Sequence, residues 1–293
     1  MAKCIFRRLL GIKLGVLHQH VPQSLHFKDE AIIARDVANL PIISLVTPSF
    51  NQGIYIHKTI ESVLNQKYPH LEYLIQDACS TDSTSAVLSA FPPDKFEYFI
   101  EPDKGQADAI NLGFSRSNGE IMAWLNSDDL LLPGALGLVG EFFLSHPEVD
   151  VVYGNRILID NEGKQIGRWI LPGHDADILR GIDYIPQETL FWRRRVWERA
   201  GGYVDDELNF ALDWDLLLRF SDIGAKFVHL PLLFGAFRVH ENQKTSALFV
   251  SSGLAESRLL RTRYGGNLLL RILRVFKHMI FLVKHKITDK QFD

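Results

Sequence analysis

Segments typical of strands and segments typical of helices alternate along this chain from Pro41 to about residue 125. The apolar runs at 42–46, 71–76, 96–100 and 121–125 read as strands, and apolar residues at helical spacing lie between them. Parallel strands need a long crossover, which a helix usually provides. The alternation therefore predicts an α/β fold with a mostly parallel sheet and helices on both faces.

The strand expected at 121–125 runs directly into Asn126, Ser127, Asp128 and Asp129. Ligands of open α/β sheets bind at the carboxyl ends of the strands, which is where these side chains would lie. Clustered hard oxygen ligands suit Mg²⁺ or Mn²⁺. A plainer alternative is a polar turn that caps the helix beginning after Pro133, and for an isolated pair of acids that alternative would be preferred.

Polar residues follow the other expected strands as well, and they favour the binding-site interpretation. Asp77 could read the hydrogen-bonding edge of a nucleobase, and Phe50 offers an apolar face. A cation held by Asp128 could offset the charge of a diphosphate. The chain has neither a P-loop nor a G-x-G-x-x-G turn, so phosphate binding would depend on a metal and on cationic side chains. These features predict a nucleotide-diphosphate site.

Composition describes a globular chain without a strong bias of charge. Of the 293 residues, 46% are hydrophobic and 23% charged, and the formal net charge of −3 gives no drive toward nucleic acid. Cys4 and Cys79 are far apart and support neither a disulfide framework nor a zinc site. Lys13 interrupts the N-terminal apolar residues before they form a signal-peptide core, and no window approaches roughly 18 uninterrupted apolar residues. We expect a cytoplasmic protein without a spanning segment.

The second half of the chain switches to an α+β pattern. Residues 151–159 and 164–170 flank a turn at 160–163 and predict an antiparallel hairpin, and a helix is expected to begin near Asp213. We interpret residues 41–245 as one catalytic domain, with a basic N-terminal extension at 1–40 and a basic, amphipathic helical extension at 246–293.

With these motifs in order, the chain resembles the inverting family 2 glycosyltransferases of the GT-A fold over roughly residues 41–245. The similar segments are residues 43–51, 60–66, 77–82, 101–105, 108–111 and 126–129. The resemblance implies a GT-A type Rossmann-like sheet with a smaller antiparallel portion on the acceptor side. It also implies a nucleotide-diphosphate sugar, here expected to be a UDP-sugar, as the donor, and Mn²⁺ or Mg²⁺ as the cofactor.

The resemblance also assigns residues to roles. Asp128 and His240 would hold the metal, and Asp213 would be the catalytic base. The donor nucleotide would be bound by Pro48, Phe50, Asp77, Lys104, Asp108, Asp129 and Lys244. Asn126 departs from the family, because it occupies the first acidic place of the DxD motif, and it leaves open whether Asp128 or Asp129 is the direct ligand. Gln187 and Glu188 lie where the family recognises acceptors.

Displacement at an anomeric carbon needs a base that removes the proton of the attacking hydroxyl, and positive charge beside the leaving diphosphate on the opposite side. A single displacement of this geometry inverts the configuration. The plainer interpretation of Asp213 is a helix N-cap, and that of Asp215 is a first-turn acid favoured by the helix dipole. We expect Asp215 to be structural.

The C-terminal segment is basic and apolar at once. On a helix, Asn267, Arg271, Arg274, His278 and His285 would form a narrow polar stripe opposite a broad apolar face. This pattern is typical of a helix lying in an anionic membrane surface. A helix that packs on the protein, with Lys and Arg reaching out to water, is an equally good interpretation.

The leading hypothesis is an inverting, metal-dependent transferase that moves a sugar to a saccharide or lipid-linked saccharide acceptor in bacterial cell-surface polysaccharide synthesis, on the inner face of the cytoplasmic membrane. The alternative is a non-catalytic sugar-nucleotide-binding or scaffold subunit, with Asn126 marking a decayed metal site. A nucleotidyltransferase would need a Gly-rich loop with an Arg after the first strand, and residues 47–53 hold one Gly and no Arg.

Overall fold

The computed structural model describes residues 11–25, 37–241 and 252–292. Its strands are β1 Ile43–Ser49, β2 Leu71–Asp77, β3 Glu97–Ile100, β4 Ile121–Trp124, β5 Leu130–Leu131, β6 Val151–Ile159, β7 Gln165–Trp169, β8 Leu190–Arg193 and β9 Phe227–Arg238. Its α-helices are α2 Ile56–Leu64, α3 Thr84–Ser89, α4 Gln106–Ser115, α5 Ala135–Ser145, α6 Ala176–Leu179, α7 Arg194–Arg199, α8 Leu212–Asp222, α10 Leu254–Tyr264 and α11 Leu268–Gln291, with short 3₁₀ turns η1 Val37–Asn39 and η2 Gln187–Thr189.

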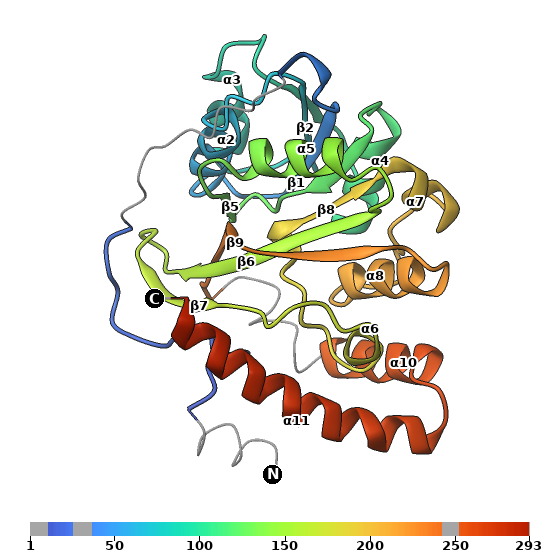
Figure 1. Ribbon diagram of the computed structural model, residues 1–293. Helices are drawn as coiled ribbons and strands as arrows, with labels where there is room; N and C mark the ends of the chain where they lie inside the picture. The colour runs from blue at the N-terminus through green and yellow to red at the C-terminus, as the bar shows by residue number, and fades with distance from the viewer. Residues whose placement is uncertain (1–10, 26–36, 242–251, 293) are drawn as a thin grey trace.

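The strands form one sheet in the order β3-β2-β1-β4-β8-β6-β9-β5, with β7 paired to β6 (Figure 1). The first four strands run parallel, and β8 joins the edge of β4 in the antiparallel sense. Strands β1 and β4 are neighbours, and the sheet continues from β1 to β2 and β3 on one side and from β4 to β8 on the other. In sheets of this kind ligands bind outside the carboxyl ends of the strands around such a switch point.

Strand β4 shows why its sequence is apolar throughout. Met122 and Trp124 face one buried cluster, whereas Ile121 and Ala123 face another. A parallel strand covered on both sides has no face left for water, so both sets of alternating side chains are apolar. Residues of α4, α7 and α8 pack in the first cluster, and residues of α2, α3 and α5 pack in the second.

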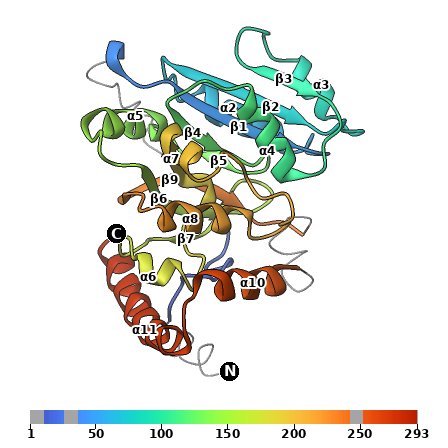
Figure 2. The same cartoon turned by 90° about the vertical axis from the view of Figure 1, so that its right-hand side faces the viewer.

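Both ends of the described chain pack onto the body. Ile12, Leu14, Leu260 and Phe281 belong to the same buried cluster as the face of β4 that bears Trp124. Helices α10 and α11 lie at the end of the molecule opposite β3 and α3 (Figure 2). The expected division into a domain at 41–245 and two extensions stays a prediction, but the described parts of the extensions share the hydrophobic core of that domain.

The α/β class and the GT-A type fold expected from the sequence are confirmed. The strands of the first half lie where the apolar runs predicted them, with β1 extending to Ser49 and β9 longer than expected. Strands β5 and β8 and helix α6 were not predicted, since they are two to four residues long and carry no periodic signal. Within the described residues, every helix is too short or too polar to cross a membrane.

Candidate active site

A cavity of about 710 Å³ lies at the carboxyl ends of β1 and β4. Its wall combines residues from these strand ends with the start of α8, with Phe237 near the end of β9, and with His240 just beyond that strand. Six of the residues that the sequence predicted for the site line it: Pro48, Phe50, Asp128, Asp129, Asp213 and His240. The fold thus brings together residues that lie up to 192 positions apart in the chain, from Pro48 to His240.

Asp77 lies behind the wall of this cavity. Its carboxylate is buried and accepts hydrogen bonds from the backbone N–H of Ser80 (2.8 Å) and from the Ser80 hydroxyl (2.6 Å). The Ser80 hydroxyl in turn accepts a hydrogen bond from the backbone N–H of Asn51 (2.7 Å). Asp77 therefore fixes the loop after β2 against the loop after β1, where Phe50 is exposed.

Lys104 and Asp108 also lie outside the cavity wall. The Asp108 carboxylate accepts a hydrogen bond from the Lys104 backbone N–H (2.9 Å), so this pair closes the turn that begins α4. Their neighbours Asp103, Gly105 and Gln106 line the cavity instead. The last predicted donor residue, Lys244, lies outside the described residues.

Asp128 and His240 form the contact at the centre of the site. The His240 Nε2 atom lies 2.9 Å from Asp128 Oδ2, and the Asp128 side chain is 19% exposed to the cavity. The His240 ring also packs 4.8 Å from the ring of Tyr55, centroid to centroid. One residue follows β4 and the other follows β9, so the sheet itself sets their spacing.

Asp129 has a different environment from its neighbour. Its buried carboxylate accepts hydrogen bonds from the Arg238 backbone N–H (2.9 Å) and the Asn126 amide (3.2 Å). Burial raises its pKa well above the ordinary value, and the nearby Asp128 and Glu188 carboxylates raise it further. With both oxygens occupied by protein donors, Asp129 holds the end of β9 in place, and Asp128 is the acid that faces the cavity.

Asn126 is the centre of an amide network. Its side-chain oxygen accepts a hydrogen bond from the Gln106 amide (2.6 Å), and its nitrogen donates to Asp129 and to the Gln187 side-chain oxygen (3.2 Å). Gln187 donates in turn to the carbonyl of Trp124 (2.8 Å). An aspartate at position 126 would have no proton to donate to Asp129 and Gln187, so the amide suits this position.

The site can be compared with the needs of a hard divalent cation. Among the described residues there is no cluster of three His, Cys, Asp or Glu side chains with the spacing of metal ligands. Asp128 and His240 supply one oxygen and one nitrogen. Mg²⁺ and similar ions are commonly bound by one or two protein ligands, with substrate phosphates and water completing the shell. The pair fits an ion bound together with a nucleotide.

Asp213 stands at the start of α8, on the cavity wall. The helix N-cap is Ala211, so the N-cap interpretation of Asp213 is wrong. Burial raises the pKa of Asp213 to about 6, although the hydrogen bond from the Trp214 backbone N–H (2.9 Å) favours the charged form. Asp215 is buried and its carboxylate pairs with Arg219 Nε at 2.7 Å, which confirms that it is structural.

Sequence reasoning missed a cation in the cavity wall. The Arg156 guanidinium lies between the rings of Trp169 (3.8 Å) and Phe237 (4.7 Å) and pairs with Glu188 at 3.4 Å. A single Arg inside the apolar run of residues 151–159 was the available signal, because charged residues are rarely buried in a strand without a partner. Glu188 itself was noted in the sequence, but its burial was not foreseen.

The cavity is strongly acidic. Among the described residues, its wall holds six carboxyl groups and one guanidinium, that of Arg156. Asp183 is exposed to the cavity, and partial desolvation there, together with the neighbouring Asp213 carboxyl, raises the pKa of Asp183. Burial likewise raises the pKa of Glu188, against the influence of Arg156. The carboxyl groups are Asp103, Asp128, Asp129, Asp183, Glu188 and Asp213.

Several buried polar atoms of the wall have no hydrogen-bond partner among the described residues. Buried polar groups in native proteins are nearly always paired, so such atoms are expected to bind ligand or water. They are Ser49 Oγ, Gln52 Oε1, Asp103 Oδ2, Trp124 Nε1, Arg156 Nε and Glu188 Oε1.

Comparison with known proteins gives a consistent result. Residues 44–203 match the family model described as glycosyl transferase family 2. The chondroitin synthase of Escherichia coli is 28% identical over 223 residues, which is 75% of this chain and 32% of that protein. This chain therefore spans about a third of the length of that relative.

Two solved structures share the fold. S. aureus TarS in complex with UDP-GlcNAc superposes with a TM-score of 0.61 at 20% identity, covering 75% of this chain and 65% of the other. The mannosyltransferase PcManGT of Pyrobaculum calidifontis, in complex with GDP-Man and Mn²⁺, gives a TM-score of 0.55 at 14% identity and covers 98% of this chain and 94% of the other.

Proposed function

Because the chain belongs to glycosyltransferase family 2, we propose that it transfers a sugar from a UDP-sugar to a saccharide or lipid-linked saccharide acceptor in bacterial cell-surface polysaccharide synthesis. One observation carries the proposal. Asp128, His240 and Asp213, from three distant parts of the chain, share the wall of one cavity large enough for a nucleotide-sugar. The chondroitin synthase relative supports the polysaccharide setting, and the UDP-GlcNAc complex of TarS supports the donor class.

The donor nucleotide is proposed to lie on the β1 side of the cavity. Pro48 and the exposed ring of Phe50 provide an apolar surface for the base and ribose. Ser49 Oγ, Gln52 Oε1 and Asp103 Oδ2 are the buried atoms with spare hydrogen-bonding capacity on this side. Asp77 acts indirectly in this proposal, since it holds the loop that presents Phe50. Direct roles for Lys104, Asp108 and Lys244 stay predictions.

The metal dependence follows from charge. The described residues of the wall supply six carboxyl groups and one guanidinium, so the carboxylates among them would repel a diphosphate that entered without a cation. Asp128 and His240 would hold a Mn²⁺ or Mg²⁺ ion, and a bound divalent cation supplies positive charge to the diphosphate as it leaves. The Mn²⁺ in the PcManGT complex supports this part of the proposal. Asn126 does not count against it, because its amide serves the network that supports Asp129.

Asp213 is proposed as the base that accepts the proton of the attacking hydroxyl. A base works best when its pKa lies near the pH at which it operates, and burial brings the pKa of Asp213 to about 6. The hydroxyl oxygen then bonds to the anomeric carbon while the bond from that carbon to the diphosphate oxygen breaks. Attack from the side opposite the leaving group inverts the configuration.

The acceptor is proposed to lie beside Asp213, against Glu188, Arg156 and the Trp124 indole N–H. Each of these side chains has a buried polar atom that no described residue satisfies. The lining of this side favours a neutral saccharide over an anionic one, because Arg156 is the only cation among the described lining residues, whereas the carboxyl groups of Asp183, Asp213 and Glu188 can bind sugar hydroxyls.

A panel of nucleotide-sugars tests the proposal. A donor that binds the folded protein and not the unfolded chain raises the apparent stability of the protein by mass action. Thermal unfolding of the protein with each nucleotide-sugar, with and without Mn²⁺, therefore identifies the donor. We expect a UDP-sugar to raise the melting temperature only with the metal, and slow release of UDP to follow. Binding of nucleotide-sugars without turnover, across all donors and acceptors tested, would refute catalysed sugar transfer and favour the scaffold alternative. Stabilisation by another nucleotide-sugar alone would refute the UDP donor.

A further inference from the structure

Helix α11 packs on the body with the two histidines of its polar stripe inward, whereas Asn267 and Arg271 of that stripe are exposed. His278, His285 and Asp289 are buried, together with Phe281 and Leu282. The Leu14 backbone N–H donates to His285 Nε2 (3.1 Å), and His285 Nδ1 lies 2.6 Å from the carbonyl oxygen of Ile170. Asp289 pairs with Arg168 Nε at 2.8 Å. Hydrogen bonds and an ion pair thus hold the inner side of this helix.

The outer side of α11 is apolar and faces water. Residues of an α-helix advance by about 100° each, so residues spaced three or four apart share a face. Leu269 and Phe276 are 64% and 65% exposed, and the other residues of the face are similarly exposed. This outer face consists of Leu269, Ile272, Leu273, Phe276, Ile280, Val283 and Ile287. Soluble proteins rarely expose a continuous apolar stripe of this length without a use for it.

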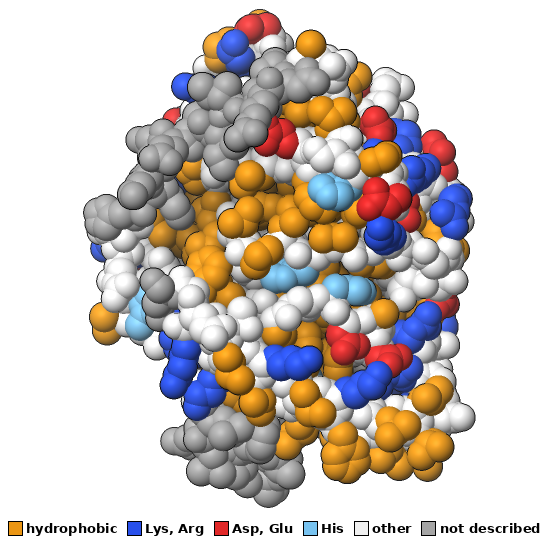
Figure 3. Space-filling model, viewed as in Figure 1, with side chains coloured by type: hydrophobic (Ala, Val, Ile, Leu, Met, Phe, Trp, Pro, Cys, Tyr) orange, Lys and Arg blue, Asp and Glu red, His pale blue; other side chains and the backbone are white. Residues whose placement is uncertain are grey.

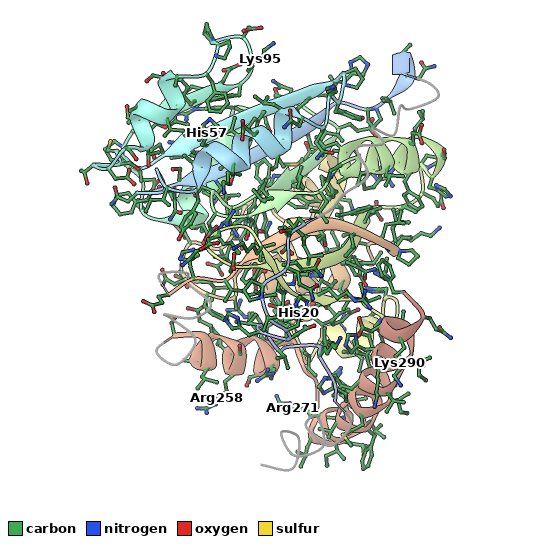
Figure 4. All side chains as sticks on the ribbon, turned by 90° about the vertical axis from the view of Figure 1, so that its left-hand side faces the viewer. His20, His57, Lys95, Arg258, Arg271 and Lys290 are labelled. Carbon is green, nitrogen blue, oxygen red and sulfur yellow. The ribbon has the colours of Figure 1, made fainter. Side chains whose placement is uncertain are left out.

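The exposed charges on α10 and α11 themselves are all positive, and the exposed Asp177 of α6 pairs with one of them, Lys277. Between residues 252 and 292 no acid is exposed, because Asp289 is buried and Glu256 is half-buried against the loop at 209–211. The exposed cations of the same span are Arg258, Arg261, Arg263, Arg271, Lys277, Lys284 and Lys290. Arg258 projects from the lower side of α10 in Figure 4, and Lys290 lies at the C-terminal end of α11. Hydrophobic side chains gather at the lower right of Figure 3, where α11 begins.

We propose that the outer face of α11 is a docking surface for an anionic lipid membrane. A helix lying in the plane of a membrane buries its apolar side chains among the acyl chains, and cations beside them bind the lipid phosphates. The outer face and its exposed cations match both parts of that environment. A second copy of this chain fits less well, because a symmetric interface would place the same cations against one another.

The docking surface is joined to the acceptor side of the cavity. Glu256 of α10 accepts hydrogen bonds from the backbone N–H groups of residues 209–211, just before Asp213. Arg261 Nε of α10 donates to the carbonyl of Gly181 (2.8 Å), two residues before Asp183. If the proposed function holds, a membrane-bound helix would hold the acceptor wall near the lipid surface, which suits a lipid-linked saccharide.

Vesicle binding by the full chain tests the docking surface directly. The protein is sedimented with vesicles of phosphatidylcholine alone and with vesicles that also contain phosphatidylglycerol. We expect binding to the anionic vesicles that weakens as salt is raised. The variant Phe276→Ser/Ile280→Ser should bind about tenfold more weakly, because two apolar anchors are lost. Lys284→Gln/Lys290→Gln should bind roughly twenty-five-fold more weakly, since each cation near an anionic surface contributes about fivefold.

Matched variants elsewhere provide the controls. Leu144→Ser removes an exposed apolar side chain from α5, and Lys58→Gln/Lys95→Gln removes two exposed cations far from α11. Both control variants should bind anionic vesicles as the unchanged protein does.

Absence of vesicle binding, equal binding to neutral vesicles, or unchanged binding of both α11 variants would overturn the proposal. So would light scattering that shows a dimer dissociated by Phe276→Ser/Ile280→Ser, which would identify the face as an interface between copies. Because vesicle binding needs no donor, these outcomes leave the proposed transfer reaction untouched.

Discussion

Replacement of Asp213 by Asn should abolish transfer and stabilise the protein at the same time. The asparagine has the same shape and can still accept the hydrogen bond from the Trp214 backbone N–H, but it cannot accept a proton from the acceptor. Loss of a general base costs about 10²- to 10⁴-fold in rate. We therefore expect kcat to fall at least about 100-fold while donor binding, measured by calorimetry, stays the same.

The gain in stability follows from the pKa of Asp213, which rises from 3.8 to about 6 on folding. Between these pH values the unfolded chain loses the proton while the folded protein keeps it, so the free energy of unfolding falls as the pH rises. Two units correspond to an upper limit of about 3 kcal/mol. Since the side chain is partly exposed to the cavity, we expect Asp213→Asn to gain about 1–2 kcal/mol at pH 8.

Urea unfolding of both proteins at pH 5 and pH 8 measures this effect. The advantage of the variant should be about 1 kcal/mol larger at pH 8, because ionisation of the folded wild type is complete only there. Asp215→Asn is the matched control: it weakens the buried pair with Arg219 and should destabilise by about 1–3 kcal/mol while keeping the base. Full turnover of Asp213→Asn, or no change of its stability advantage with pH, would refute the role and the environment assigned to Asp213.

Further predictions concern the pH profile, the metal and the support of the site. The rate kcat/KM should fall as the pH drops through about 6, since the charged form of Asp213 is the base, and a profile flat from pH 5 to 8 would contradict this. Asp128→Ala or a chelator should abolish Mn²⁺-dependent UDP binding, and an unchanged calorimetric titration would count against the metal pair. Asp129→Ala should lower the free energy of unfolding by about 1–3 kcal/mol, because the buried Arg238 N–H loses its acceptor; equal urea midpoints would show otherwise. Glu256→Ala should raise KM for the acceptor more than KM for the donor. Equal increases in the two KM values would argue against a link from α10 to the acceptor wall.

Much of the site could be predicted because its residues belong to strand ends. The apolar run at 121–125 identifies a buried strand, and a buried parallel strand delivers the residues after it to the ligand-binding edge. Asp128 and Phe50 were found in this way, and Asp213 and His240 by resemblance to the family. All four line the cavity. The division of labour between Asp128 and Asp129 could not be predicted, since it depends on Arg238, which lies 109 positions away from Asp129 in the chain.

The sequence by itself determined the alternation of strands and helices in the first half of the chain, the carboxylates at the carboxyl ends of those strands, and the amphipathic character of residues 268–291. These depend on local periodicity and on the polar residues that end each run. The tertiary structure decided which side of α11 faces the body, how Arg156 packs against Trp169 and Phe237, and which acids are buried enough for their pKa values to rise. Each of these depends on contacts between segments far apart in the chain, and no local pattern specifies such contacts.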